Sequence, residues 1–151
     1  MDKNSKFYKM RQKYLSHPLQ GLGAHILYWF FAAMPIDMAS NFAGRLMRNL
    51  GPKMGQTKKA RNNLTRAFPE KSKDEIEEIV ADMWENLGRS AGEIPHLHKL
   101  QPGGPRIEIV GIEHGLASRD DGKPGLFFTG HIGNWEVSMC IATVLGMDMM
   151  S

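Results

Sequence analysis

Apolar side chains recur every three or four residues along the middle of the chain, the spacing that places them on one face of a helix. The pattern is clearest from Ile76 to Leu87. It is preceded by Ser72-Lys73-Asp74-Glu75, a capping box in which serine and glutamate satisfy free backbone N–H groups at a helix start. Met38 to Leu50 and Thr57 to Phe68 show the same spacing. We therefore expect three amphipathic helices that pack through their apolar stripes.

Towards the C-terminal end the pattern changes to one typical of β-strands. Arg106 to Val110 alternates polar and apolar residues, which predicts a strand with one buried face. Leu126 to Thr129 is a short apolar run between turn residues, typical of a buried strand. Glu113 to Arg119, between the two, is predicted as a short helix. A strand–helix–strand order predicts an α/β fold with a parallel pair of strands.

The most apolar segment of the chain runs from Leu22 to Met34. It is shorter than the roughly 20 residues that cross a bilayer unaided. Five basic residues precede it within 3–13, and its Tyr28 and Trp29 suit headgroup depth. We interpret it as a tilted or interfacial membrane helix, with a buried core helix as the alternative. A cleaved signal peptide is disfavoured because no small-residue cleavage site follows Met34.

Charge is distributed unevenly along the chain. Residues 1–66 carry twelve Lys and Arg against two Asp, whereas residues 67–151 carry seven against fourteen Asp and Glu. Met38 to Pro69 contains seven basic residues and no acidic one. Such a block is typical either of a solvated face or of binding to an anionic surface, such as lipid headgroups or nucleic acid. Nucleic acid is not expected as a partner, because interleaved aromatic residues and a known motif are lacking.

Two further groups of residues give weak chemical signals. His96 and His98 have a spacing that can ligate a metal, but no cysteine or carboxylate cluster accompanies them, so no metal site is predicted. Cys140 is the only cysteine, which excludes a disulfide within the chain and fits a reducing compartment. We interpret it as a small buried residue.

The strongest candidate site follows the predicted strand at Leu126 to Thr129. It is the segment GHIGNWE, Gly130 to Glu136. Asn134 is expected to be the N-cap of a helix that starts at Trp135. His131 would then lie at the carboxyl end of a strand, where α/β sheets bind ligands, and Glu136 in the first helical turn.

Such a pair supports general base catalysis. A neutral imidazole at His131 takes the proton of a substrate hydroxyl as that hydroxyl attacks an acyl carbonyl. Glu136 accepts a hydrogen bond from the other ring nitrogen and stabilises the imidazolium. Free N–H groups at the helix start suit an oxyanion or a phosphate. The alternative, at this point, is a histidine that caps a helix and a glutamate on a solvated turn.

Four segments resemble one family in chain order. TGHIGNWE is similar to the H-x4-(D/E) block of the lysophospholipid acyltransferase superfamily, in the form found in the bacterial lipid A late acyltransferases of the lauroyl/myristoyl type. Ala60–Ser72, ARNNLTRAFPEKS, and Met83–Leu97, MWENLGRSAGEIPHL, resemble other stretches of the same family. The apolar segment with the following GRLMRNLGP resembles its membrane-associated N-terminal region.

The resemblance implies an acyltransferase at the cytoplasmic face of the cell inner membrane. It would move a fatty acyl group from acyl carrier protein, or from acyl-CoA, to a hydroxyl of a lipid A precursor, with no further cofactor and no metal. By the same resemblance His131 is the catalytic base and Glu136 its relay partner. Gly133 and Asn134 would contribute to substrate binding.

The resemblance also implies an architecture. Residues 1–50 would form basic, apolar, membrane-associating helices, and residues 51–151 the N-terminal part of the acyltransferase domain. The expected fold is α/β, with the first strands and helices of a glycerolipid-acyltransferase-like sheet that is incomplete, because the chain resembles an N-terminal half. A catalytically inactive membrane-binding fragment is the alternative function.

Overall fold

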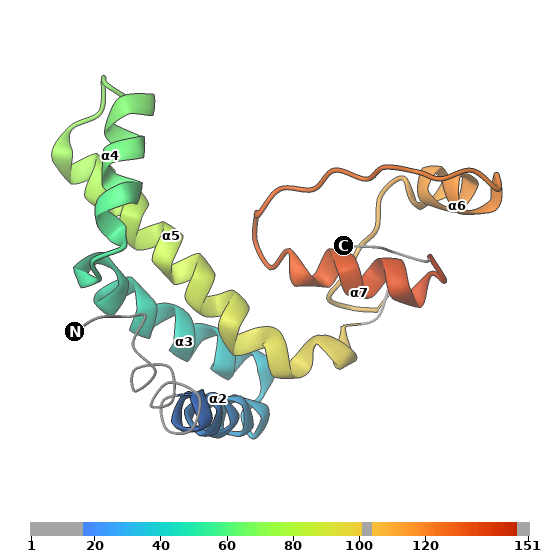
Figure 1. Cartoon of the computed structure of the whole chain (residues 1–151), viewed down its shortest axis with the longest axis horizontal. Coiled ribbons are helices and arrows are strands. Elements are labelled where there is room, and N and C mark those ends of the chain that lie inside the picture. Colours follow the sequence, from blue (N-terminus) through green and yellow to red (C-terminus); the bar gives the residue numbers. More distant parts are fainter. Residues whose placement is uncertain (1–16, 101–103, 148–151) are drawn as a thin grey trace, which may run out of the picture.

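Every regular element in the described part of the computed structural model, residues 17–100 and 104–147, is a helix (Figure 1). The α-helices are α2 (His17–Ala32), α3 (Ile36–Leu50), α4 (Thr57–Ala67), α5 (Lys73–Glu93), α6 (Ile112–Asp120) and α7 (Glu136–Val144). Two short 3₁₀ helices, η2 (Gly51–Lys53) and η3 (Ile94–Lys99), follow α3 and α5.

Helices α3 and α5 pack side by side in opposite directions and form the centre of the fold (Figure 1). Small residues make the approach close. A Cβ atom at Gly92 would lie 2.6 Å from the carbonyl oxygen of Ala39, and one at Gly88 would lie 2.5 Å from that of Ala43. Ala39 and Ala43 are themselves buried. The two backbones therefore meet at a distance that only glycine on α5 allows.

A buried hydrogen-bonded group joins the middle of α5 to the start of α4. The indole Nε1–H of Trp84 donates to Thr57 Oγ1 across 2.9 Å, and that hydroxyl donates to the Gly51 carbonyl across 2.7 Å. Thr57, Gly51 and Trp84 are all buried. Because these polar groups are hydrogen-bonded to one another, they can be buried without a large desolvation penalty. The same bonds fix the direction in which α4 leaves η2.

Part of the basic block is neutralised within the molecule. Arg48 of α3 forms ion pairs with three carboxylates of α5, those of Glu78, Asp82 and Glu85. Arg61 of α4 donates to Glu77 of α5 and, across 2.7 Å, to the carbonyl of Pro52. The acidic face of α5 is therefore the partner of two arginines of this block, for which the sequence left a solvated face and an external anionic surface as alternatives. The other five basic residues of the block are exposed: Arg45, Lys53, Lys58, Lys59 and Arg66.

The predicted helices are confirmed, with small shifts at their ends. Elements α3, α4 and α6 correspond to the predictions for 38–50, 57–68 and 113–119. Helix α5 begins at the predicted capping box, in which Ser72 Oγ accepts from the Glu75 N–H and the Glu75 carboxylate accepts from the Ser72 N–H. Of its predicted stripe, Ile76, Val80 and Trp84 are buried, whereas Met83 and Leu87 stay 40% exposed.

The predicted α/β fold is wrong, because no strand occurs in the described residues. Residues 106–110 keep the predicted alternation, with Ile107 and Ile109 half-buried and their neighbours exposed, but they form no ladder. Residues 126–129 are extended and exposed, with Phe128 88% accessible. A strand needs a partner backbone, and a single parallel pair buries too little to be stable. The alternation at 106–110 and the apolar run at 126–129 are local patterns, and they carry no information on whether a segment pairs with another strand.

Helix α2 contains no buried residue, so the alternative of a buried core helix is wrong. It touches the rest of the molecule at its C-terminal end, where the buried His96 of η3 lies 3.0 Å, Nε2 to O, from the Phe31 carbonyl. Among the helices that the structure describes, none is both long and apolar enough to cross a bilayer. The basic residues predicted to precede this helix, within 3–13, lie outside the described part. Binding to a membrane, like the division at residue 50, stays a prediction.

Candidate functional site

The GHIGNWE segment forms a loop, residues 130–136, that leads into α7 (Figure 1). Glu136 lies in the first turn of α7, as predicted, but the helix begins at Glu136 and not at Trp135. The predicted N-cap is wrong: Trp135 occupies that position and no side chain caps the helix. The amide of Asn134 is engaged elsewhere, since its Nδ2 donates to Glu93 Oε2 across 2.8 Å. Tertiary contact with α5 has replaced the local contact that the sequence favoured.

Two backbone N–H groups at the start of α7, where the sequence predicted free donors for an oxyanion or a phosphate, are hydrogen-bonded within the first turn. The N–H of Val137 donates to the Asn134 carbonyl across 3.2 Å, and that of Ser138 to the Trp135 carbonyl across 3.1 Å. These two groups are consequently occupied within the turn.

Gly133 has a conformation that explains why glycine stands in the middle of the loop. Its φ of 58° lies in the left-handed region, which side chains disfavour. Its carbonyl accepts from Ser90 Oγ across 3.2 Å and from Asn86 Nδ2 across 3.4 Å, both on α5. Gly133 and Asn134, predicted to bind substrate, are thus the residues through which the loop is attached to the helical core.

His131 and Glu136 lie on either side of that attachment. His131 is exposed, and its ring packs against Trp135 with the two centroids 4.9 Å apart. Glu136 is half-buried. In the described part of the chain no hydrogen bond joins the two side chains. Catalytic hydrogen bonds often form only when substrate is bound, so their pairing stays a prediction.

An ion pair fixes the segment that enters this region from η3. Arg106 donates two hydrogen bonds, of 2.8 and 2.7 Å, to the carboxylate of Asp37 in the first turn of α3. These bonds hold the pKa of Asp37 below its usual range. They also raise the pKa of Arg106, with a smaller contribution from the nearby negative charge of Glu93.

No group of three or more potential metal ligands occurs in the described residues. His96 uses its Nε2 for the Phe31 carbonyl, and its Nδ1 lies 3.4 Å from Lys99 Nζ. Its buried ring therefore holds η3 against α2.

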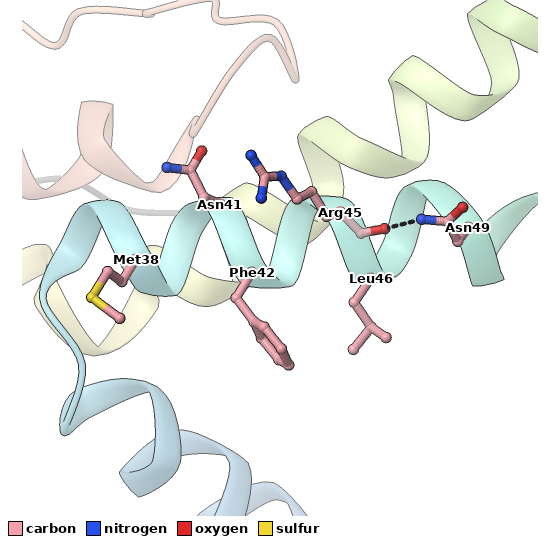
Figure 2. A pocket seen from close by; sticks show the side chains of 6 residues that line it. All are labelled: Met38, Asn41, Phe42, Arg45, Leu46 and Asn49. Carbon is pink, nitrogen blue, oxygen red and sulfur yellow. Dashed lines mark hydrogen bonds between the residues drawn. The ribbon is translucent and has the colours of Figure 1, made fainter.

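A shallow groove of about 490 Å³ lies on α3, away from His131. Figure 2 shows Met38, Phe42 and Leu46 projecting from one side of the helix, with Asn41 and Arg45 on another. All three apolar side chains are more than 40% exposed. The ring of Phe42 lies 5.9 Å from that of Phe30 of α2, centroid to centroid. The apolar side of α3 and the surface of α2 are thus continuous, and we call them together the α2–α3 apolar surface.

The sequence matches the family model of the bacterial lipid A biosynthesis acyltransferases over residues 8–150. The chain belongs to this family. No curated protein and no solved structure shows significant similarity to it. The match includes every described residue, and it confirms the resemblance on which the sequence analysis ended.

Met83–Leu97 is one of two family-like stretches of this lipid A acyltransferase chain to which the sequence alone gives no role. The structure shows that three of its residues, Asn86, Ser90 and Glu93, hold the 130–136 loop. The available signal was their spacing of four and three residues, which places polar side chains on one helical face beside the buried Gly88 and Gly92.

Proposed function

We propose that this protein transfers a fatty acyl group to a hydroxyl of a lipid A precursor. The observation that carries the proposal is the family match over residues 8–150. The GHIGNWE loop supports it, because its histidine is exposed to substrate while Gly133 and Asn134 are attached to the core.

In the proposed reaction the neutral imidazole of His131 accepts the hydroxyl proton of the acceptor. The hydroxyl oxygen forms a bond to the acyl carbonyl carbon, and the thioester bond of the donor breaks. The leaving thiolate takes up the proton that His131 holds, so the imidazole is neutral again. Glu136 orients the ring and stabilises its transient positive charge, a role that requires the side chains to approach when substrate binds.

The donor is acyl carrier protein or acyl-CoA, and neither reaction requires a further cofactor. Acyl carrier protein is the donor that we favour on the resemblance of the sequence. The experiment incubates the purified protein with a lipid A precursor and each acylated donor separately, and it detects the acylated product by mass spectrometry. Product formation supports the proposal.

We further propose that the protein works at the cytoplasmic face of the inner membrane, where anionic lipid and the phosphorylated acceptor are found. The α2–α3 apolar surface supports this, because a soluble protein rarely exposes so many large apolar side chains together. Exposed basic residues on η2 and α4, including Lys53, Lys58 and Lys59, would face anionic headgroups.

The alternative is a membrane-binding protein without acyltransferase activity, which the same exposed surface favours. The two functions are distinguished by combining the transfer assay with vesicle flotation. Vesicle binding without any acylated product, from either donor, would favour the alternative.

A further inference from the structure

Three polar residues of α5, Asn86, Ser90 and Glu93, hold the 130–136 loop from one side, and we call them the α5 clamp. Their contacts converge on two adjacent loop residues, Gly133 and Asn134. The clamp therefore holds the loop at one place, between the two candidate catalytic residues. Gly133 lies two residues after His131, and Asn134 lies two residues before Glu136.

Glu93 is the member that connects this point to the rest of the core. One carboxylate oxygen, Oε1, accepts from Ser40 Oγ of α3 across 2.7 Å. The other, Oε2, accepts from Asn134 Nδ2 across 2.8 Å. Ser40 is only 7% exposed. A hydrogen bond to a charged carboxylate is stronger than one between neutral groups. Glu93 thereby links the loop to both central helices.

The amide of Asn134 depends on this link. Its Oδ1 is buried and has no hydrogen-bond partner in the described structure, so Nδ2–H···Glu93 is the polar contact that stabilises the group. Losing Glu93 would leave both ends of a partly buried amide unsatisfied, which is costly in the protein interior. The amide would then turn towards water and take the loop backbone with it.

We propose that Glu93 is a positioning residue, which sets the distance between His131 and Glu136 through Asn134 and so controls the rate of the acyl-transfer step. The inference rests on the proposed function and adds to it a residue that touches neither substrate nor the reacting atoms. His131 has one aromatic neighbour, Trp135, in the described part. The attachment at Gly133 begins two residues along the chain from His131, so it restricts where the His131 backbone can lie.

The test compares Glu93→Ala with Glu93→Gln in the full chain. The glutamine oxygen can still accept from Asn134, and its amide can donate to Ser40 Oγ, so Glu93→Gln keeps both contacts without the charge. We expect Glu93→Ala to lower kcat by about tenfold to a hundredfold with KM nearly unchanged, since small misplacements of reacting groups cost about this much. Glu93→Gln should restore most of the rate.

Hydrogen exchange gives a readout that does not depend on activity. In Glu93→Ala the amides of residues 130–136 should exchange faster, while those of α3 and α5 exchange as in the wild type. The matched control is Asn41→Ala, which removes another polar link between the central helices, the 2.7 Å bond from Arg89 Nη1 to Asn41 Oδ1. It should change neither the loop exchange nor kcat.

The outcomes separate this inference from the proposed function. A wild type that forms no acylated product from either donor would reject the proposed function itself, whereas an active His131→Ala would reject only the role of His131. With His131→Ala inactive, an unchanged kcat in Glu93→Ala would overturn only the role of Glu93. Faster exchange throughout α3 and α5, or a Glu93→Gln variant as slow as Glu93→Ala, would also overturn it, because the effect would then be global unfolding or charge.

Discussion

Gly92 of α5 lies directly against the backbone carbonyl of Ala39 on α3, so that a Cβ atom on Gly92 would be 2.6 Å from that oxygen. One helical turn earlier, Gly88 stands in the same relationship to Ala43. This contact brings Ser40, which lies beside Ala39, within hydrogen-bonding distance of Glu93. The glycines therefore determine both the packing of the central helices and the location of the residue that holds the candidate site.

Replacing Gly92 by alanine should destabilise the protein. The atoms in the way belong to the backbone of α3 and cannot move aside like a side chain, so we expect a loss of about 1–3 kcal/mol in the free energy of unfolding. Urea denaturation measures it. Gly23→Ala is the control, because no atom lies within 4 Å of a Cβ at that position of α2. A stability of Gly92→Ala equal to that of the control would contradict the close packing of α3 and α5.

The acidic face of α5 should make stability depend on pH. Hydrogen bonds from Arg61 hold the pKa of Glu77 below its usual value. A carboxyl group with a lowered folded-state pKa stabilises the fold above its unfolded pKa, and this contribution is lost as the pH falls through the folded value. Glu77→Gln should therefore be less stable than the wild type at neutral pH, and the difference should shrink as the pH falls below the usual range of carboxyl pKa values and through the lowered pKa of Glu77.

The measurement is chemical denaturation of wild type and Glu77→Gln at several pH values. Glu70→Gln serves as the control, since Glu70 is exposed just before α5 and Arg61 pairs with Glu77. A difference between wild type and Glu77→Gln that persists unchanged in acid would show that the ion pair contributes nothing.

The α2–α3 apolar surface should bind anionic vesicles. Ile26 lies on α2 and is 61% exposed. Burying such a side chain in the bilayer contributes about 1.5–3 kcal/mol to the binding free energy. Ile26→Asp removes this apolar area and introduces a charge. We expect flotation with anionic vesicles to weaken by at least about tenfold. High salt should weaken binding of the wild type as well, because it screens the basic residues.

Ala117→Asp is the matched control for the vesicle experiment, since it adds the same charge to an exposed position on α6. It should float like the wild type. Equal loss of binding in both variants would mean that net charge, and not the apolar surface, determines binding.

The sequence predicted the helices well because their signals are local. The capping box at Ser72 and the stripe of α5 each depend on residues within three or four positions of one another, as does helix formation itself. The strand predictions were wrong because strand pairing depends on a second backbone far away in the chain. The alternation at 106–110 carries no information about such a partner. The internal ion pairs of Arg48 and Arg61 were missed for the same reason, since their acidic partners belong to another helix.

The candidate site shows the same division. The position of Glu136 at the start of α7 was predictable from the turn-forming residues before it. The attachment of Asn134 to Glu93 was not predictable, because the local sequence favours Asn134 as an N-cap. In the structure its amide instead binds a residue 41 positions away in the chain. The glycine pair of α5 was readable as a small residue every fourth position, but only the partner alanines on α3 reveal what it packs against.

The central claim is that His131 is the base of an acyl-transfer reaction. The most direct test measures acyl transfer to a lipid A precursor by His131→Ala beside His114→Ala, which removes an exposed histidine of α6. Losing a general base costs about a hundredfold or more in rate. We predict that loss for His131→Ala and wild-type turnover for His114→Ala. Wild-type turnover in His131→Ala would contradict the assignment.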